Sequence, residues 1–246
     1  MFIASFAAGP WQTNCYLVST VQPLGETDGS GTDTPRECVI IDPGVEAAEL
    51  VEKVLAEQRL TPVAIIATHG HLDHIHAAEE LCRRHGIALW IHPADRHLLT
   101  DPLAGIGQAA APLLQQLNGS TTLTAPDRVE ELSDGQQLTL AGITFTVITA
   151  PGHTAGCVML QTPYPIGGAA EAPEGIDRVV FTGDVLFAGS IGRTDLPGGD
   201  HEAMLESLRT KVLPLVDTAV LLPGHGPQTS MAAERATNPY LQGDQL

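Results

Sequence analysis

The sequence is poor in basic residues. Its 246 residues include 12 Lys and Arg against 29 Asp and Glu, which gives a formal net charge of −17 at pH 7. Because proteins bind nucleic acid largely by neutralising phosphates with Lys and Arg, this balance argues against a nucleic-acid partner. It also means that an anionic small molecule would need a local cation to overcome the overall field of the protein.

Long apolar runs and paired cysteines are also missing. No segment approaches the roughly 20 apolar residues of a membrane span, and Met1 to Ala8 lacks the basic start and long apolar centre of a signal peptide. Single cysteines at positions 15, 38, 82 and 157 show neither zinc-ribbon nor disulfide spacing. We therefore expect reduced thiols in a cytoplasmic protein without a membrane partner. Cys157 lies four residues after His153, in a strand-like run, and is expected to pack rather than bind metal.

What the sequence does contain is a dense group of metal-binding side chains. Residues 68–74 read THGHLDH, and neutral imidazole nitrogens and carboxylate oxygens suit zinc, iron or manganese. His69 and His71 are two apart and point the same way in an extended segment. Asp73 and His74 are adjacent and must diverge, so one ion cannot easily use all four side chains. The motif predicts a site for two metals; the alternative is a solvated loop that happens to be rich in histidine.

Four strand-like runs each lead into a histidine or an aspartate. The runs lie at 63–67, 143–149, 178–181 and 219–222, and they precede THGHLDH, PGH at His153, GD at Asp184 and PGH at His225. Short apolar, β-branched runs are typical of buried strands, and ligand sites in α/β proteins usually form where such strands end. We expect the four ends to meet at one edge of a sheet. Each histidine alone would more often be a surface or core residue, but the repetition favours a shared site.

Helices and loops are expected between these runs. Apolar residues at helical spacing predict helices at 46–58, 77–85 and 200–212. Two segments rich in Gly and Pro are expected to be solvated loops, at 22–37 and 164–177.

THGHLDH, followed by the PGH, GD and PGH sequences at His153, Asp184 and His225, resembles the motifs of the metallo-β-lactamase-fold hydrolases. The stretch at 181–200, FTGDVLFAGSIGRTDLPGGD, is similar to the short, single-domain members of the glyoxalase II (hydroxyacylglutathione hydrolase) branch. The resemblance covers nearly the whole chain. It implies an α/β fold, namely a four-layer αββα sandwich of two mixed sheets with helices on the outer faces. It also implies one domain over residues 1–246, without an appended C-terminal helical domain.

The resemblance further implies two divalent metal ions, zinc first, with iron or manganese as alternatives. The implied ligands are His69, His71 and His153 for one ion, Asp73, His74 and His225 for the other, and Asp184 for both. Asp73 is also expected to orient the attacking group, so Asp73 and Asp184 are the implied catalytic residues. Ala77 stands where the family commonly has Gly, and His76 is an additional imidazole that we interpret as an ordinary polar residue of the helix.

This ligand set suggests a reaction. Water held between two divalent ions ionises readily, since a metal-bound water reaches a pKa of about 7 against about 15.7 for free water. The resulting metal-bridging hydroxide would attack a carbonyl that the metals polarise. A thioester suits such a site, because a thiol with a pKa of about 8.5 leaves as thiolate without a strong acid. The implied function is hydrolysis of a small-molecule thioester such as a hydroxyacylglutathione, which releases a hydroxy acid such as lactate and the free thiol.

Two residues are candidates for roles beside the ligands. Arg193 matches a position where glyoxalase II enzymes carry a basic residue for the carboxylate of the thiol; a salt bridge with Asp195 is the alternative. Asp42 follows a strand-like run and is expected either to support the ligand loop by hydrogen bonds or to be a turn residue. Longer glyoxalase II enzymes add basic residues for glutathione in a C-terminal domain, whereas the residues after His225 include one cation, Arg235.

Other activities stay open on the sequence alone. A persulfide dioxygenase shares the GRTD stretch at 192–195 but uses a single iron held by two histidines and one aspartate, and the complete second ligand set argues against it. A lactonase, another hydrolase of the superfamily or a non-catalytic metal-binding protein are further alternatives. The sequence does not indicate the oligomeric state.

Overall fold

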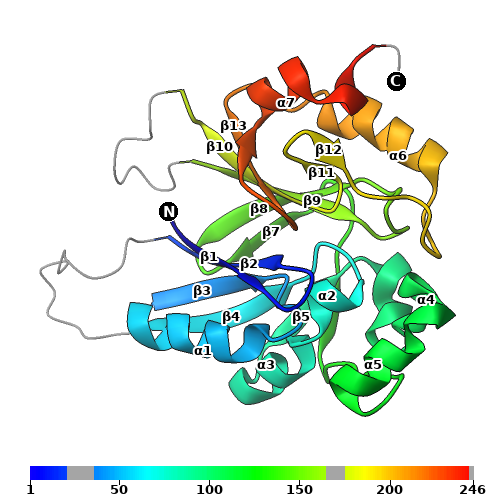
Figure 1. Ribbon diagram of the computed structural model, residues 1–246. Helices are drawn as coiled ribbons and strands as arrows, with labels where there is room; N and C mark the ends of the chain where they lie inside the picture. Colours follow the sequence, from blue (N-terminus) through cyan, green and yellow to red (C-terminus); the bar gives the residue numbers. More distant parts are fainter. Residues whose placement is uncertain (21–35, 165–174, 244–246) are drawn as a thin grey trace, which may run out of the picture.

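A computed structural model describes residues 1–20, 36–164 and 175–243, in which the chain forms two six-stranded sheets (Figure 1). The predicted loops at 22–37 and 164–177 lie mostly outside the described residues. Among the described residues, no helix is both long enough and apolar enough to cross a bilayer.

The first sheet has the order β1-β2-β3-β4-β5-β6 and is mixed: antiparallel from β1 to β3, parallel from β3 to β6. Its strands are β1 (Phe2–Ala8), β2 (Thr13–Ser19), β3 (Arg36–Ile41), β4 (Leu60–Ile66), β5 (Ala88–Ile91) and β6 (Val129–Glu131). Parallel neighbours need a crossover connection. Two crossovers run through helices, α1 (Ala47–Gln58) before β4 and α3 (Ala78–His85) before β5.

The second sheet has the order β14-β13-β10-β9-β8-β7. Its strands are β7 (Gln137–Leu140), β8 (Ile143–Thr149), β9 (Val158–Pro163), β10 (Arg178–Gly183), β13 (Ala219–Pro223) and β14 (Thr229–Ser230). Because β9 is antiparallel to both β8 and β10, and β13 is parallel to β10, the strands β8, β10 and β13 all run in the same direction. A separate hairpin pairs β11 (Leu186–Phe187) with β12 (Ser190–Ile191).

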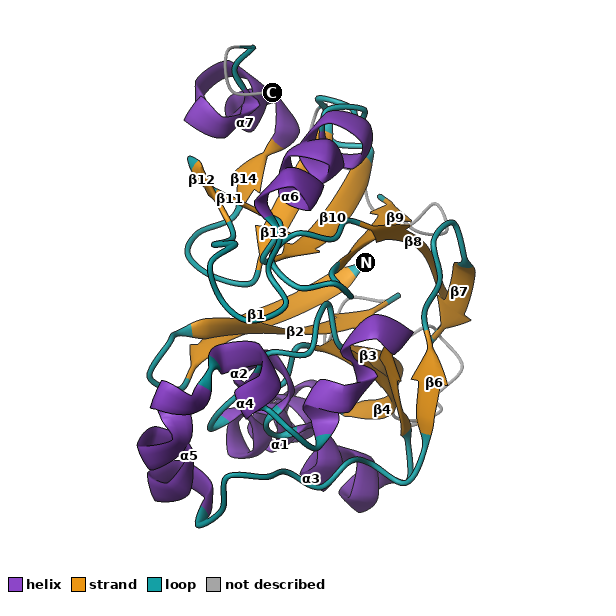
Figure 2. Ribbon diagram, turned by 90° about the vertical axis from the view of Figure 1, so that its right-hand side faces the viewer, coloured by secondary structure: helices purple, strands orange, loops and turns teal. Residues whose placement is uncertain are grey.

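The remaining helices are short. The α-helices are α2 (Leu72–Ile75), α4 (Leu103–Ile106), α5 (Ala111–Asn118), α6 (His201–Ser207) and α7 (Met231–Thr237). The other helical turns are η1 (Pro93–Leu99), η2 (Gln108–Ala110), η4 (Pro239–Leu241) and the π-helical η3 (Leu208–Val212). Figures 1 and 2 show α1 and α3 on the outer side of the first sheet and α6 on the outer side of the second.

The packing of the strands defines four layers. In β2, Cys15 and Leu17 pack in the cluster that includes α1 and α3. Tyr16 and Val18 point the other way and pack between the two sheets, as the two-residue period of a strand requires. On the far face of the second sheet, Val180 packs in a cluster with α6 and α7. The predicted αββα sandwich is therefore confirmed.

Most predicted elements are present, with two corrections. The predicted strand at 143–149 is β8, and the predicted helix at 200–212 is α6 continued by η3, with the Asp200 side chain accepting a hydrogen bond from Ala203 N–H (3.0 Å) as its cap. The helix predicted at 77–85 is preceded by a separate helical turn, α2. The expectation that the four runs meet at the edge of one sheet is wrong: β4 belongs to the first sheet, and β8, β10 and β13 belong to the second.

Candidate metal centre

The seven predicted ligands lie together at one end of the sandwich, between the two sheets. Four follow β4, in the loop to α2 and in α2 itself, and one follows each of β8, β10 and β13. Their donor atoms form three overlapping groups, each with all atoms within 4.8 Å of one another: His69, His71 and His153; His69, His74 and Asp184; Asp73, His74 and His225. The ligands thus come from the edges of two sheets, whereas the sequence predicted that they come from the edge of a single sheet.

Asp184 lies at the centre of this cluster. Its Oδ1 is 3.3 Å from His74 Nε2. Its Oδ2 is 3.5 Å from His153 Nε2 and 3.4 Å from His225 Nε2. On one side, His71 Nδ1 is 2.8 Å from His153 Nε2. Asp184 is therefore in contact with residues of both predicted ligand triads.

Several buried nitrogen and oxygen atoms of the cluster make no hydrogen bond within the protein. His69 and His74 are fully buried and Asp184 is 6% exposed, yet His69 Nε2, His74 Nε2 and Asp184 Oδ1 make no hydrogen bond. An unpaired buried polar atom costs about 1–3 kcal/mol, so native proteins rarely leave such atoms together without a further partner. Nitrogen and carboxylate donors at these spacings suit divalent cations. The residues present therefore fit metal ions.

The ring nitrogens that face away from the cluster are held by fixed acceptors. The outer nitrogens and acceptors are His74 Nδ1 with Asp42 Oδ2 (3.0 Å), His153 Nδ1 with the carbonyl of Arg193 (2.7 Å) and His225 Nδ1 with the carbonyl of Trp11 (3.1 Å). When the outer nitrogen donates, the inner nitrogen keeps its lone pair, and the ring cannot rotate. This is the arrangement that metal-binding histidines have in proteins.

Burial and charge favour the metal-binding forms of two of these side chains, His71 and Asp73. Burial, reinforced by His153, lowers the pKa of His71 to about 4, which leaves this imidazole neutral at pH 7. Burial alone would raise the pKa of Asp73, but the charge of His74 and a hydrogen bond from His225 lower it to about 2. Neutral imidazole and ionised carboxylate are the forms that coordinate a cation.

His74 and His225 differ in this respect. Burial alone would also lower their pKa values, but the neighbouring carboxylates of Asp184 and Asp73 raise the pKa of His74 and raise that of His225 to about 9. An ion that binds there would therefore displace a proton from each ring.

Asp42 supports the ligand loop by hydrogen bonds, which is one of the two roles that the sequence suggests for it. It is 1% exposed, and its two oxygens accept the backbone N–H and the hydroxyl of Thr68, each at 2.7 Å. Together with the contact to His74, these bonds fix the start of the ligand loop.

Asp95, which the sequence reasoning did not single out, joins the two loops that carry the first triad. Its Oδ2 accepts the Gly70 N–H (2.8 Å) and the Thr154 hydroxyl (2.6 Å), and its Oδ1 accepts the Gly156 N–H (2.8 Å). Asp95 is 1% exposed. No motif marks this residue, because two of its three partners are backbone groups and one of the two loops lies about sixty positions further along the chain.

Asn14 and Thr13 join β2 to the second triad. The Asn14 amide donates to the carbonyls of Pro223 and Gly226, both at 2.9 Å, and so holds the loop of His225 on each side. The Thr13 hydroxyl donates to Asp73 Oδ2 at 2.9 Å. Strand β2 of the first sheet is thus hydrogen-bonded to the proposed ligand Asp73 and to the loop that carries His225.

Two glycines allow the backbone to approach the cluster closely. A Cβ at Gly224, the glycine of the second PGH sequence, would overlap Asp184 Oδ1 and lie 2.6 Å from His74 Cε1. A Cβ at Gly105 in α4 would lie 2.9 Å from His71 Cδ2. The absence of a side chain at these positions therefore shapes the site directly.

Above the cluster is a cavity of about 560 Å³. Its floor includes five of the seven predicted ligands, all except His69 and His74. Its walls are mainly apolar and come from the β1–β2 turn, from α4 to α5, and from the β11–β12 hairpin with the segment after it. The large apolar residues that line the cavity are Trp11, Leu72, Ile106, Leu113, Phe187, Ile191 and Leu196.

Arg193 lines this cavity, but its guanidinium is already paired. Its Nε and Nη2 donate to the two carboxylate oxygens of Asp195 at 2.7 and 2.8 Å, and the side chain is 60% exposed. The structure thus shows the salt bridge that the sequence leaves as the alternative. The backbone of Arg193 has a second contact, since its carbonyl accepts from His153.

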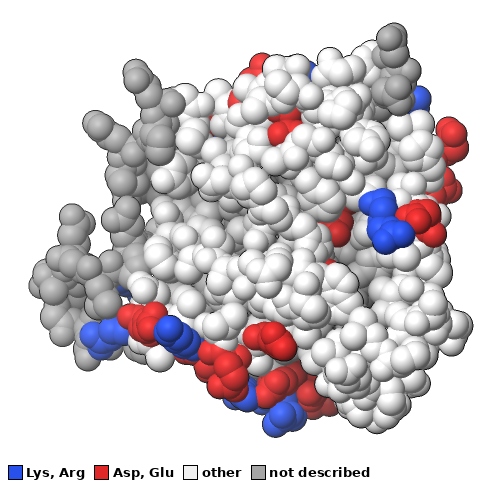
Figure 3. Space-filling view, in the orientation of Figure 1, with Lys and Arg blue, Asp and Glu red and all other residues white. Residues whose placement is uncertain are grey.

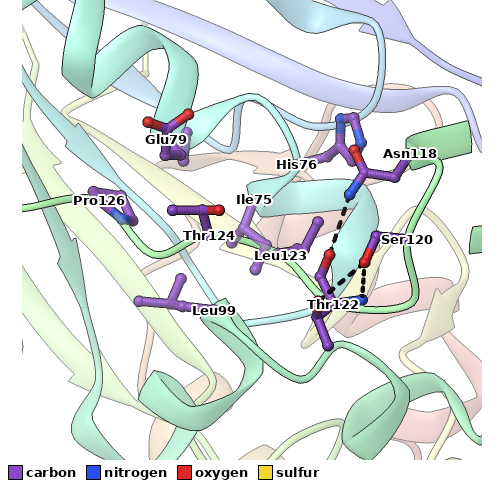
Figure 4. A pocket seen from close by; sticks show the side chains of 11 residues that line it. Ile75, His76, Glu79, Leu99, Asn118, Ser120, Thr122, Leu123, Thr124 and Pro126 are labelled. Carbon is purple, nitrogen blue, oxygen red and sulfur yellow. Dashed lines mark hydrogen bonds between the residues drawn. The ribbon is translucent and has the colours of Figure 1, made fainter.

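His76 and Cys157 lie apart from the ligand groups. His76 lines a different pocket of about 360 Å³, together with Asn118 and Thr122 (Figure 4). Cys157 is buried in the core cluster beneath α6 and α7, and all four cysteines are free and buried. Cys157 therefore has the packing role expected of it. His76 lies at the end of α2 rather than in the first turn of α3, and it belongs to none of the three ligand groups.

Comparison with known proteins identifies the family. The family model of the metallo-beta-lactamase superfamily matches residues 8–166 and 173–225. The chain belongs to this superfamily, and it is a metal-dependent hydrolase.

Two relatives illustrate the range of similarity. An uncharacterized protein of Mycobacterium tuberculosis is 40% identical over 244 residues, which cover 99% of each chain. A protein of Haemophilus influenzae named hydroxyacylglutathione hydrolase GloC is 37% identical over 211 residues, which cover 85% of this chain and 89% of the relative.

Two solved structures have the same architecture over almost the whole chain. The BLEG-1 B3 metallo-beta-lactamase superposes with a TM-score of 0.74 at 36% identity and covers 98% of this chain and 100% of its own. The di-iron-bound form of TTHA1623 has a TM-score of 0.69 at 34% identity and covers 97% and 100%.

Proposed function

We propose that the protein hydrolyses thioesters of a low-molecular-weight thiol, as a hydrolase of the hydroxyacylglutathione (glyoxalase II) type. One observation carries the proposal. Apart from Arg193, every titratable side chain that lines the cavity belongs to the seven-residue cluster, among the residues that the structure describes. The site therefore offers no separate general acid for a poor leaving group. A thiol, with a pKa of about 8.5, leaves as thiolate without one. The similarity to GloC supports this choice.

The seven clustered residues are the proposed ligands of two divalent ions. The proposed assignment is His69, His71 and His153 for one ion, Asp73, His74 and His225 for the second, and Asp184 for both. Zinc is the proposed metal, with iron and manganese as alternatives; the di-iron form of TTHA1623 supports a site for two ions in this architecture. Bound ions would supply Lewis acidity and ionise water for attack on the thioester carbonyl.

The protein's own residues would position the reactants. Asp73 lines the cavity and its Oδ2 is held by the Thr13 hydroxyl, so this carboxylate is fixed where it can accept a hydrogen bond from the attacking water. The apolar side chains of Trp11 and Leu113 would cover the bound thioester and exclude bulk water, which strengthens electrostatic interactions at the carbonyl. Arg193 is the proposed polar contact at the rim.

A persulfide dioxygenase and another hydrolase of the superfamily are the alternatives to a thioester hydrolase. A persulfide dioxygenase with a single iron needs one triad, and the second complete group around Asp73 argues against it. Other hydrolytic activities, such as lactonase activity, use the same chemistry. The similarity to the BLEG-1 B3 metallo-beta-lactamase adds β-lactam hydrolysis to that set.

A parallel assay of the purified protein distinguishes these candidates. Metal content would be measured together with turnover of S-lactoylglutathione, of the lactoyl thioester of N-acetylcysteamine, of a lactone and of a β-lactam. We expect about two metal ions per chain and thioester hydrolysis faster than lactone or β-lactam hydrolysis. A single iron with oxygen uptake on glutathione persulfide, or turnover of β-lactams or lactones alone, would contradict the proposal.

A further inference from the structure

We infer that the natural substrate is a thioester whose thiol part carries no net negative charge and whose non-reacting part is apolar. This inference rests on the proposed thioester hydrolysis and concerns the walls of the same cavity. Three features carry it: the apolar walls, the pairing of the wall cation with a carboxylate and the net negative charge of the chain.

The walls expose large apolar side chains to solvent. Trp11 is 39% exposed and Leu113 is 38% exposed, and they are two of the five large hydrophobic residues with the greatest exposure among the described residues. They come from different elements, the β1–β2 turn and α5, yet both line the cavity above the cluster. Exposed apolar surface is covered favourably by an apolar ligand. The walls therefore match a hydrocarbon-rich acyl or thiol group.

The rim offers no net positive charge. Arg193 is the one Lys or Arg among the described residues that line the cavity, and Asp195 binds its guanidinium through two hydrogen bonds. Figure 3 shows a broad face with few charged side chains, while a mixed group of charges gathers over α1 and α3, where Arg84 pairs with Glu49. A thiol that carries carboxylates would find no unpaired cation among the described wall residues.

The remaining charge disfavours anions. The whole chain has a formal net charge of −17, whereas the carboxylates of the floor, Asp73 and Asp184, would be neutralised by the proposed metal ions. Cations held by the floor residues would attract the reacting carbonyl, whereas the rest of the substrate would contact the walls. Because a negatively charged protein repels an anionic ligand, an anionic thiol ester such as that of glutathione would bind slowly. Arg193, held by Asp195, would then donate a hydrogen bond to a neutral group such as an amide.

Matched substrates test the inference. The same acyl group, lactoyl or hexanoyl, would be presented on glutathione and on N-acetylcysteamine, an uncharged thiol. We expect kcat/KM to be higher for the N-acetylcysteamine esters by about tenfold or more, and higher for hexanoyl than for lactoyl. Added KCl should raise kcat/KM for the glutathione esters and leave the uncharged esters unchanged, because salt screens repulsion. Equal or faster turnover of the glutathione esters at low salt would overturn the inference.

A pair of leucine variants tests the role of the walls. Leu113 lines the cavity and Leu50 lies on α1, away from it, and both are 38% exposed. Leu113→Lys adds a cation to the wall. It should reduce the ratio of kcat/KM for the N-acetylcysteamine esters to kcat/KM for the glutathione esters by about fivefold or more, and Leu50→Lys should leave this ratio unchanged. Asp195→Asn, which frees the Arg193 guanidinium, should act in the same direction as Leu113→Lys. The same response in Leu113→Lys and Leu50→Lys would contradict the inference.

The two levels of the proposal fail in different ways. Background rates for the esters of both thiols, in protein with its full metal content, would reject thioester hydrolysis itself and the inference with it. Rapid turnover that favours the glutathione esters would reject the uncharged substrate and leave the hydrolase in place.

Discussion

The floor and the walls of the cavity are built in different ways. The floor follows the ends of long strands from both sheets, and buried carboxylates, Asp42 and Asp95, hold its loops. The walls come from the β1–β2 turn, from short helices and from a hairpin of two-residue strands, and they expose side chains such as Trp11 and Leu113. The two sheets therefore determine which side chains can bind metal, whereas the short surface elements around the cavity determine which substrate can bind there.

The largest expected effect comes from breaking the floor at its centre. Asp184→Ala removes the carboxylate that contacts His74, His153 and His225. We expect thioester hydrolysis to fall by about a thousandfold or more, because metal ions supply several kcal/mol of transition-state stabilisation. Metal content measured by elemental analysis should fall with it. Retained turnover would contradict a bridging role for Asp184.

A smaller loss is expected when the support of the floor is changed. Asp95→Asn keeps one acceptor but places an amide against a backbone N–H, so the loops of the first triad lose a hydrogen bond. Metal affinity, measured by competition with a chelator, should fall by about 10–100-fold.

Glu234 provides the matched control for this change. It is 2% exposed and also accepts three hydrogen bonds, from Gly189, Thr229 and Asn238, but none of these residues bears a proposed ligand. Glu234→Gln should lower the free energy of unfolding and keep the metal affinity. If both variants lose metal affinity equally, Asp95 stabilises the fold in general and has no specific role in holding the ligand loops.

A third variant tests the contact between wall and floor. Gly105 lies in α4, and an added Cβ would be 2.9 Å from His71 Cδ2 and 3.2 Å from Leu98 Cδ2. Gly105→Ala should therefore cost about 1–3 kcal/mol of stability and lower kcat/KM by about tenfold, as His71 is displaced. At Gly243 nothing lies within 4 Å of a Cβ, so Gly243→Ala is the control. Unchanged kinetics in Gly105→Ala would show that the wall and His71 are independent.

The smallest effect is expected far from both regions. Asp134 accepts from Lys211 Nζ (2.8 Å) and from the Thr149 N–H (2.9 Å), and the hydrogen bond from Lys211 lowers its pKa. A lowered pKa means that the stabilisation is present above the unfolded pKa of about 3.9 and is lost as the pH falls through the lower folded value.

Asp134→Asn should accordingly reduce the free energy of unfolding at pH 7 by about 0.2–1 kcal/mol, since the pair is partly exposed and screened. Urea unfolding at pH 7 and at pH 3 would show the difference from the parent shrinking at the lower pH, and kinetics should not change. A loss of activity would link this ion pair to the site.

The floor was largely predictable from the sequence, because its residues form short motifs after strand-like runs. His69 and His153, for example, stand in motifs that can be read without a structure, and strand β8 has the predicted bounds. The expectation of a single sheet edge failed because local patterns do not say which strands pair. Asp95 was missed because it acts mainly through backbone groups, and its residue type is common at turns.

The walls were not predictable. Trp11 and Leu113 are ordinary apolar residues in the sequence, and they become neighbours of one cavity only when the β1–β2 turn and α5 pack near the same loops. For Arg193 the sequence offered two interpretations, a contact to the substrate and a salt bridge with Asp195, and side-chain geometry was needed to show that the salt bridge forms. Substrate choice depends on such long-range packing more than ligand identity does.

Metal dependence of thioester hydrolysis is the most direct test of the proposed function. The protein would be stripped with a chelator and titrated with Zn²⁺ while hydrolysis of the lactoyl thioester of N-acetylcysteamine is followed. We expect no turnover in the metal-free protein and full recovery at about two ions per chain. Undiminished turnover without metal, or no turnover at any metal content, would contradict it.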